Sequence, residues 1–267
     1  MSCKLLIIII YIDIFNRGGN NMMLGKGVLI KNKHKENMQI EEYKMKLIGK
    51  DRLREVVELQ HYVYENLPNK DVLYMDSYED MLGDLENGAK IIGVLNSQDR
   101  LVAYRYISFP RKEKRNLGYD IKLPEKDLEK VVHLETTVVD PLYRGNGLQL
   151  VTLEKAKEIA KQEGYRHFMC TVSPYNFYSL YNVMRGGLKI KALKKKYGTK
   201  PDDSDGLWRF ILHNDLDKKF YTPADLVLSK WANLEMQKSL IDQGYIGYEI
   251  IKDTKELSYV KVDEAYA

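Results

Sequence analysis

Residues 133–150 read HLETTVVDPLYRGNGLQL, and this stretch decides the fold that we expect of the chain. An apolar, β-branched run ends at Asp140, the segment Arg-Gly-Asn-Gly follows at residues 144–147, and a helix-like pattern begins after it. This order predicts a strand that turns directly into a helix. Glycines let the backbone approach a ligand closely, and the first N–H groups of a helix have no partner inside it. With Arg144 beside them, these groups predict a binding site for an anion such as a phosphate.

The flanking sequence extends this junction into a strand–helix–strand unit. We expect a strand at residues 131–139, a helix from about residue 147 to 162 that ends at Gly164, and a strand at residues 167–172. The helix has an apolar stripe formed by Leu153, Ala156, Ile159 and Ala160. Two strands joined through a helix are parallel, with a right-handed crossover. The unit therefore predicts a mixed α/β layer arrangement.

Further elements are expected on both sides of this unit. Before it we expect a helix at residues 51–67, in which Gln60 is the one polar residue of the apolar stripe, and a short helix at residues 78–85 capped by Ser77. A hairpin at residues 90–95 and 101–109 and a charged loop at residues 110–127 come next. After the unit we expect a short helix at residues 177–185 and strands at residues 188–193 and 207–212.

The two ends of the chain differ from this central part. Residues 5–12 form an apolar block that is too short to span a bilayer, and no small-residue cleavage site comes after it. Residues 17–21 are what a ribosome-binding sequence would encode if it were read in frame, so we hypothesise that the natural chain begins at Met22 or Met23 and that residues 1–21 are a non-native leader. The intact mass of the protein made from its own gene tests this hypothesis.

Three segments result: the leader, a main domain at residues 22–218 and an α+β extension at residues 219–267 that packs on the domain. In the extension we expect a helix with Thr222 as its cap and Pro223 in its first turn. A helix over residues 233–243 continues it or begins anew, and strands at residues 245–251 and 257–262 complete the chain.

Composition excludes several classes of protein. The formal charge is +4, from 42 Lys and Arg against 38 Asp and Glu, which is too balanced for a protein that binds nucleic acid through its phosphates. The only cysteines are Cys3 and Cys170, and Cys170 lies in an apolar run, so neither a disulfide framework nor a metal site is expected. We expect a cytoplasmic protein without a membrane span.

Residues 139–148, VDPLYRGNGL, resemble the acyl-CoA pyrophosphate loop of the GNAT superfamily of N-acyltransferases. The strand end and turn TVSPYN at residues 171–176, then Ser179 and Gly187-Leu188, are similar to the second half of that family's signature. The resemblance is specific over residues 131–191 and compatible from about residue 44 to 214. It implies a mixed, mostly antiparallel sheet with a splayed pair of parallel strands flanked by helices, and acetyl-CoA as co-substrate.

The resemblance also implies where acetyl-CoA binds. The acyl carbonyl and the pantetheine arm would meet the backbone of Thr137, Val138 and Val139. The pyrophosphate would meet Arg144, Gly145, Asn146, Gly147, Leu148 and Gln149. Asn176 would hydrogen-bond the pantetheine, and Ser179 would line the same slot.

Two positions depart from the family pattern. Gln149 stands where glycine or alanine is usual, which implies either a helix start slightly farther from the phosphate or a Gln amide that acts as a donor. Val183 stands where many members place the tyrosine proposed as general acid. Tyr181, or else Tyr178 one helical turn away, is the alternative acid.

Removal of a proton from the acceptor is the larger chemical requirement. Presenting a lysine-like amine neutral at pH 7 costs about 4.6 kcal/mol, whereas a thiolate takes up its proton there with about 2 kcal/mol to spare. Glu135 lies on the strand that leads to the acyl site and is the expected general base, with His133 as second choice. Cys170 has no evident activating partner, so we expect direct transfer without a covalent enzyme intermediate.

These observations predict an N-acetyltransferase that moves acetyl from acetyl-CoA to a primary amine in a ternary complex. A non-catalytic acyl-CoA sensor or docking module is the alternative, and a hydrolase on the same scaffold is a more distant one. The sequence does not separate a small amine from a peptide or a tRNA-borne acceptor. The extension could either cap the acceptor pocket or form a homodimer contact.

Overall fold

The computed structural model of the protein describes residues 22–33, 35–217 and 223–262. The predicted non-native leader and the predicted capping residue Thr222 lie outside the described residues. Among the described residues no helix is both long and apolar enough to cross a membrane.

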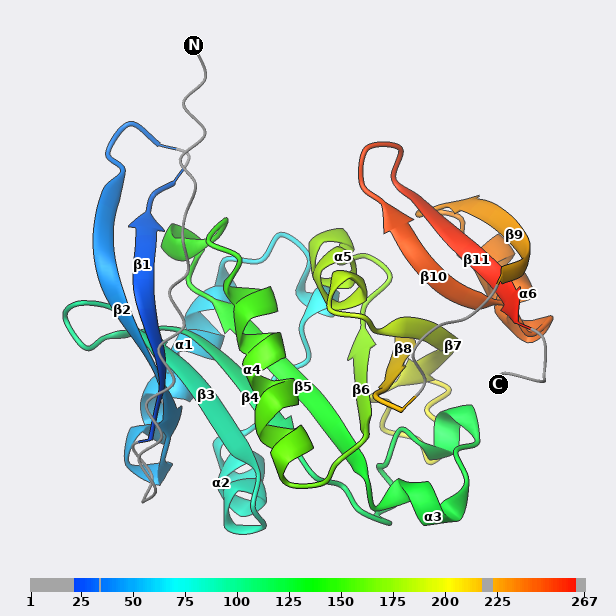
Figure 1. Cartoon of the computed structure of the whole chain (residues 1–267), viewed down its shortest axis with the longest axis horizontal. Coiled ribbons are helices and arrows are strands. Elements are labelled where there is room, and N and C mark those ends of the chain that lie inside the picture. The colour runs from blue at the N-terminus through cyan, green and yellow to red at the C-terminus, as the bar shows by residue number, and fades with distance from the viewer. Residues whose placement is uncertain (1–21, 34, 218–222, 263–267) are drawn as a thin grey trace.

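The described strands form one sheet that is mostly antiparallel (Figure 1). Its spatial order is β1 (Met23–Lys31), β2 (Gln39–Ile48), β3 (Lys90–Leu95), β4 (Leu101–Ser108), β5 (Val131–Val139), β6 (His167–Val172), β8 (Leu207–Asp215), β7 (Lys189–Lys196), β10 (Ile246–Ile251), β11 (Glu256–Val262) and β9 (Pro223–Lys230). In the described sheet β5 and β6 are the parallel neighbours, as the strand–helix–strand unit predicts. The fold is thus the mixed α/β arrangement with one parallel pair that we expected.

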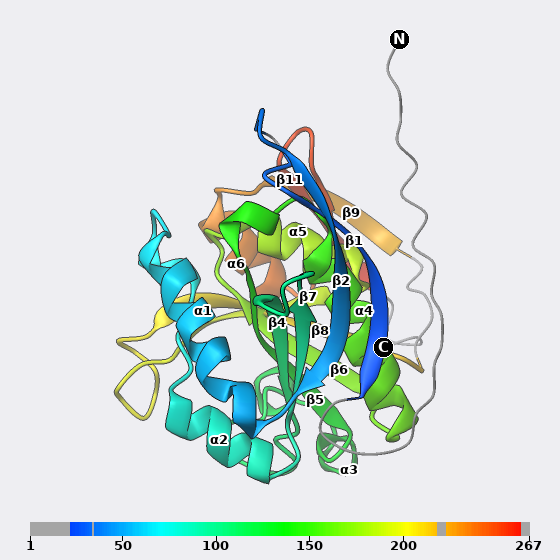
Figure 2. The ribbon, with the colours of Figure 1, turned by 90° about the vertical axis from the view of Figure 1, so that its left-hand side faces the viewer.

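Helices cover both faces of the central strands (Figure 2). On one face lies α4 (Leu148–Gln162), and on the other lie α1 (Leu53–Glu65) and α2 (Tyr78–Glu86). The other α-helices described are α3 (Glu125–Leu128), α5 (Phe177–Arg185) and α6 (Leu234–Asp242). Each covering helix turns its apolar stripe to the sheet, which gives a large hydrophobic cluster on each face. A third, smaller cluster contains Val131, Met169 and Ile211.

The start of α4 is tied to the strand beneath it. Arg105 of β4, which is 1% exposed, donates from its guanidinium to the Gln149 carbonyl oxygen at 2.9 Å and to Thr152 Oγ1 at 3.3 Å. Leu153, Ala156 and Ala160 of the same helix are fully buried against the sheet. These contacts fix the position of the loop that precedes the helix.

A β-bulge in β5 determines what its side chains face. Arg105 pairs with Thr137, but Ile107 pairs with Leu134, so the register with β4 shifts by one residue between them. The extra residue places both Glu135 and Thr136 opposite Tyr106. Instead of alternating, these two side chains both reach groups on the α1 and α2 side of the sheet.

The parallel pairing of β5 and β6 ends at the same place. The pairs run from Val131 with His167 to His133 with Met169, and no further pair joins the two strands. The backbone edge of β5 from the bulge onward is therefore open toward β6. This opening is the splay that the family resemblance implies.

The structure corrects two parts of the sequence interpretation. The β1–β2 hairpin occupies a stretch for which no strand was predicted, although β1 is largely apolar and β2 alternates apolar with charged residues. The predicted helix at Pro223 is wrong: residues 223–230 form strand β9, which pairs with β11 from Glu256 to Val262. A pairing partner more than twenty-five residues away overrides the local helix signal. Helix α6 begins after Asn233, which caps it by accepting from the Met236 N–H.

The extension joins the main sheet through β10. Gly247 of β10 pairs with Ile190 of β7, and strands β10, β11 and β9 continue the sheet from there. The expected division at residue 219 thus falls between two strands of one continuous sheet.

Candidate active site

A cavity of about 780 Å³ opens where β5 and β6 separate. Its walls include residues on both sides of the sheet. On the α4 and α5 side these are Thr137, Gln149, Cys170, Asn176, Ser179 and Val183. On the α1 and α2 side they are Asp76, Asp80, Asp84, Tyr106, Arg115 and Glu135, with Tyr197 and Asp203 nearby. The cavity therefore joins a narrow slot between strands to a wider compartment rich in carboxylates.

The loop before α4 has the geometry of an anion site. Gly145 and Gly147 have positive φ angles of 82° and 71°, and the helix begins at Leu148. The backbone N–H groups of residues 145–149 donate no hydrogen bond to any described residue. A Cβ built on Gly147 would meet no atom within 4 Å, so space lies open in front of these donors. Arg144 is exposed beside them.

Asn146 holds this loop against β1. Its Oδ1 accepts from the Ile30 N–H at 2.9 Å, and its Nδ2 donates to the carbonyl oxygens of Ile30 at 2.9 Å and Tyr143 at 2.8 Å. Lys33 donates to the Gly145 carbonyl oxygen at 2.8 Å. The Asn146 side chain is thus committed to ordering the loop, which leaves its backbone N–H for a ligand. Lys33 adds a cation that the sequence interpretation missed.

The slot between the splayed strands contains an unsatisfied hydroxyl group. Thr137 Oγ1 is buried and has no hydrogen-bond partner among the described residues, which is costly unless a ligand supplies one. Asn176 lines the cavity and caps α5 through Oδ1, which accepts from the Ser179 N–H at 3.1 Å, while its Nδ2 donates to no described residue. Val138 is buried in the core on the α1 side, and neither it nor Val139 is among the residues that line the cavity.

The Gln149 side chain extends from α4 to α5 along the wall of the slot. Its Nε2 donates to Ser179 Oγ at 3.0 Å, and its Oε1 accepts from Asn182 Nδ2 at 2.9 Å. The sequence left open whether this amide would face the phosphate. In the structure the amide instead ties the first turn of α4 to α5.

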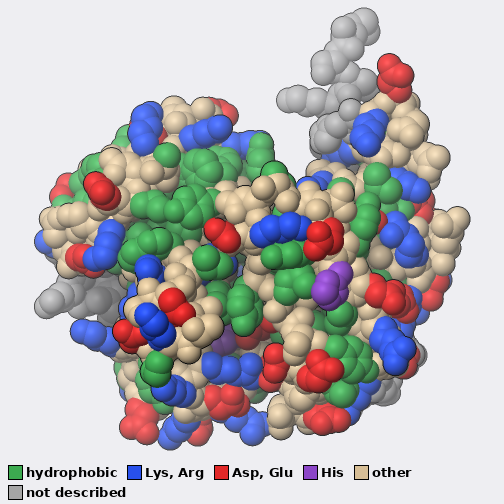
Figure 3. Space-filling model, turned by 180° about the vertical axis from the view of Figure 1, so that it is seen from behind, with side chains coloured by type: hydrophobic (Ala, Val, Ile, Leu, Met, Phe, Trp, Pro, Cys, Tyr) green, Lys and Arg blue, Asp and Glu red, His purple; other side chains and the backbone are tan. Residues whose placement is uncertain are grey.

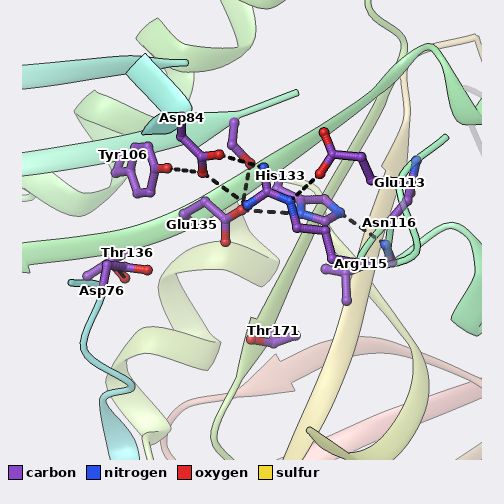
Figure 4. A network of polar contacts seen from close by, with 12 residues as sticks. Asp76, Asp84, Tyr106, Glu113, Arg115, Asn116, His133, Glu135, Thr136 and Thr171 are labelled. Atoms are coloured by element: carbon purple, nitrogen blue, oxygen red, sulfur yellow. Dashed lines mark hydrogen bonds and ion pairs between the residues drawn. The ribbon is translucent and has the colours of Figure 1, made fainter. Parts of the chain in front are cut away.

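Glu135 lies inside the carboxylate-lined compartment with two partners (Figure 4). Ser108 Oγ donates to Glu135 Oε1 at 2.6 Å, and His133 Nδ1 lies 3.2 Å from the same oxygen. His133 Nε2 accepts from the Leu117 N–H at 3.0 Å, which assigns the proton of the neutral ring to Nδ1 and makes it a donor to Glu135. Burial acts to raise the pKa of Glu135, but the His133 and Ser108 contacts outweigh it and hold that pKa below its usual value.

The two tyrosines proposed as general acid lie outside the cavity lining. Tyr178 is 70% exposed. Tyr181 stacks on Phe177 with 6.4 Å between ring centroids, and Arg185 and Lys252 lie against its ring. Val183, which stands at the usual tyrosine position, does line the cavity. Neither Tyr178 nor Tyr181 therefore lines the slot.

Several residues of the compartment were missed by the sequence interpretation. Asp84 on α2 accepts from the Tyr106 hydroxyl group and from Arg115 at 2.7 and 3.0 Å, and Figure 4 shows this group beside Glu135. Tyr197 stacks on Tyr74 with ring centroids 4.3 Å apart. Acidic residues are common on short exposed helices, and so no feature of the sequence marked Asp84 as functional.

Figure 3 views the face opposite to that of Figure 1. Acidic and basic side chains intermingle across the lower half of this face, where no single sign of charge dominates.

A strand pair that splays at a bulge, followed by a glycine loop at a helix start, is the arrangement of the GNAT fold. Residues 52–182 match the family described as the Acetyltransferase (GNAT) family. Residues 52–182, just under half of the chain, are thus similar to the GNAT acetyltransferase domain. No curated protein matches the chain as a whole or in part.

Two solved structures agree on the fold, and a third has a weaker likeness. A protein of Acinetobacter baylyi ADP1 matches with a TM-score of 0.51 and 16% identity, over 69% of this chain and 98% of that one. An N-acetyltransferase from Staphylococcus aureus Mu50 matches with a TM-score of 0.50 and 15% identity, over 65% and 98% of the two chains. A phosphinothricin acetyltransferase from Sinorhizobium meliloti, solved with acetyl-CoA, has a TM-score of 0.48 and 18% identity, over 65% and 88%.

Proposed function

We propose that this protein transfers an acetyl group from acetyl-CoA to a primary amine, directly and within a ternary complex. The observation that carries the proposal is the continuous cavity that runs from the slot beside Thr137 to the compartment around Glu135. A thioester bound in the slot would present its carbonyl carbon to an amine in the compartment. The similarity of residues 52–182 to the GNAT acetyltransferase domain supports the same reaction type.

The residues of the slot fit acetyl-CoA, together with those of the glycine loop before α4, which lies outside the cavity lining. The free N–H groups of residues 145–149, together with Arg144 and Lys33, suit a pyrophosphate at a helix start. The unsatisfied Thr137 hydroxyl group and the Asn176 amide suit the amides of a pantetheine arm. The open β5 backbone edge at Val138 and Val139 suits the acyl carbonyl.

Glu135 is our proposed catalytic base. It accepts the proton that the amine nitrogen loses as its bond to the acetyl carbon forms and the carbon–sulfur bond breaks. The electron pair of that bond leaves with sulfur, and the resulting thiolate takes up a proton. Because Ser108 and His133 keep Glu135 ionised, the carboxylate is ready to accept.

Cys170 is unsuited to a covalent route, although it lines the cavity. Burial raises the pKa of its thiol to about 12, so it stays protonated and weakly nucleophilic at neutral pH. Direct transfer needs no enzyme nucleophile.

A thiol-release assay tests the proposed function. Purified protein, acetyl-CoA and a panel of primary amines should release free CoA in an amine-dependent manner, and Glu135→Gln should lower that rate. Binding of acetyl-CoA without CoA release by any amine would instead favour the non-catalytic sensor, and release without an amine would favour a hydrolase. Val183 in place of tyrosine keeps the sensor in consideration.

A further inference from the structure

Asp76 is a partly buried carboxyl group without a cationic partner. It lies in the segment before α2, lines the cavity, and accepts a hydrogen bond at Oδ2 from Thr136 Oγ1 at 2.5 Å (Figure 4). Among the described residues no Lys, Arg or His forms an ion pair with it, although twenty-two other such pairs connect described residues. A cation in the cavity would therefore satisfy a charge that the protein leaves uncompensated.

The protein holds Asp76 in place through two fully buried side chains. Gln60 of α1 donates from Nε2 to the Asp76 carbonyl oxygen at 2.8 Å and accepts from the Asp76 N–H at 3.4 Å. The Tyr104 hydroxyl group of β4 donates to the same Gln60 Oε1 at 3.0 Å. Gln60 is the polar residue in the otherwise apolar stripe of α1, and this clamp is the structural reason for it.

The bulge in β5 turns Thr136 toward Asp76, and this contact places Asp76 next to the end of the slot where the reaction is proposed to occur. Thr136, which contacts the Asp76 carboxyl group, precedes Thr137, whose unsatisfied hydroxyl group lies in the slot. Glu135 precedes Thr136 on the same face. Two carboxyl groups therefore stand on the acceptor side of the slot, one fixed by His133 and one by Gln60.

We propose that Asp76 binds the ammonium form of the acceptor and removes its first proton, and that Glu135 removes the second. This inference rests on the proposed function. The first step converts R–NH3+ and the Asp76 carboxylate to R–NH2 and a neutral carboxyl group. The amine then forms its bond to the acetyl carbon, its nitrogen gives a proton to Glu135, and the carbon–sulfur bond breaks. One proton returns to the thiolate and one leaves to solvent.

The surroundings of the two groups suit these different steps. Burial raises the pKa of Asp76 to about 7, Thr136 lowers it in part, and Glu135, Asp80 and Asp84 raise it further. A base of that strength is suited to an alkylammonium ion, whereas the nitrogen of a tetrahedral adduct is more acidic and can transfer its proton to a weaker base such as Glu135. Further titratable or charged groups also line this cavity: Tyr106, Tyr197, His133, Lys114, Lys196, Asp203, Arg209 and the Arg115 that is bound to Asp84. Tyr104 lies in the Gln60 clamp.

Paired acceptors test this division. Methylamine is cationic at pH 7 and hydroxylamine is neutral, and the two are similar in size. In the wild-type protein both should give CoA release. Asp76→Asn should lower kcat/KM for methylamine by about 100-fold or more and that for hydroxylamine by less than about tenfold. Glu135→Gln should lower both alike. Equal losses for the two amines in Asp76→Asn, or no loss for methylamine, would overturn the inference.

The dependence of kcat/KM on pH is a second test, and it does not require a variant that loses activity. Thr136→Val removes the hydrogen bond that lowers the pKa of Asp76, so the acidic limb of kcat/KM for methylamine should move to higher pH. Asp76→Asn should remove that acidic limb. Gln60→Leu should raise the KM for methylamine, while turnover of hydroxylamine is largely kept. An unmoved limb in Thr136→Val contradicts the inference. No CoA release from wild-type protein with any amine of the panel, these two included, would overturn the proposed function itself.

Discussion

Gln149 donates a hydrogen bond to Ser179 Oγ at 3.0 Å, and this contact joins the first turn of α4 to the first turn of α5. In the family pattern a glycine or alanine stands at this position and can make no such bond. The slot wall of this protein is thus fastened by a side chain at the point where the pantetheine arm is proposed to pass.

Replacing Gln149 should therefore reduce stability. Gln149→Ala removes the hydrogen bonds to Ser179 and Asn182, and each typically contributes about 1 kcal/mol, so we expect the free energy of unfolding to fall by about 1–2 kcal/mol. Urea denaturation measures this. An unchanged midpoint would show that the two contacts contribute nothing to stability.

Gly147 offers a matched test of the proposed phosphate site. Gly147→Glu places a carboxylate in the open space before the free N–H groups and should weaken acetyl-CoA binding at least tenfold by isothermal titration. Gly164→Glu is the control, since Gly164 has a φ of 88°, has equally open surroundings and lies beyond the other end of α4. Equal losses in the two variants would point to backbone strain in place of lost phosphate contacts.

Glu135→Gln should act on turnover and not on acetyl-CoA affinity. Loss of a positioned base typically costs about 10²–10⁴-fold in rate. The expected result is a kcat reduced within that range, with an acetyl-CoA dissociation constant within about twofold of wild type. Glu154→Gln, an exposed change on α4, is the control and should leave both quantities unchanged. A weakened affinity in Glu135→Gln alone would assign the residue to binding.

Tyr181→Phe should have a small effect. The Tyr181 ring packs on Phe177 and does not line the cavity, so its hydroxyl group is not placed to protonate a thiolate in the slot. We expect kcat to change by less than about threefold, because a group that transfers the proton typically contributes about 10²-fold or more. A loss of that larger size, measured with saturating substrates, would restore Tyr181 as the acid.

Asp76 should make stability depend on pH in a defined direction. Its pKa rises from 3.8 to about 7 on folding, so between these values the folded protein keeps a proton that the unfolded chain releases. The free energy of unfolding therefore falls as pH rises through this window, by at most about 4 kcal/mol at about 1.36 kcal/mol per unit. Asp76→Asn should be as stable as wild type near pH 4 and more stable at pH 8. Chemical denaturation at both pH values measures the difference, and a constant difference would contradict the raised pKa.

The local sequence was sufficient to predict the centre of the fold. The predicted bounds of β5, β6 and α5 agree with the structure because strand alternation, a capping asparagine and two following glycines all act within a few residues. Strand β9 was missed because its pairing with β11 is not encoded locally. The proposed anion loop was also recognisable from local sequence, because its glycines and the start of the helix are adjacent in the chain.

The acceptor compartment was predictable only in part. Glu135 could be found because it lies on the strand that leads to the slot. Asp76 and Thr136 could not be paired from sequence, since sixty residues separate them and the bulge that turns Thr136 toward Asp76 reverses the expected alternation. Of this group only Gln60 was noticeable in the sequence, as an amide in an apolar stripe.

The bonds between Asn146 and Ile30 also have a practical consequence. Strand β1 lies outside residues 52–182, yet it satisfies the side chain that orders the glycine loop. A fragment trimmed to the family boundaries would retain every residue of the motif and still lack the strand that shapes it. The minimal functional unit of this protein is thus larger than its recognisable homology.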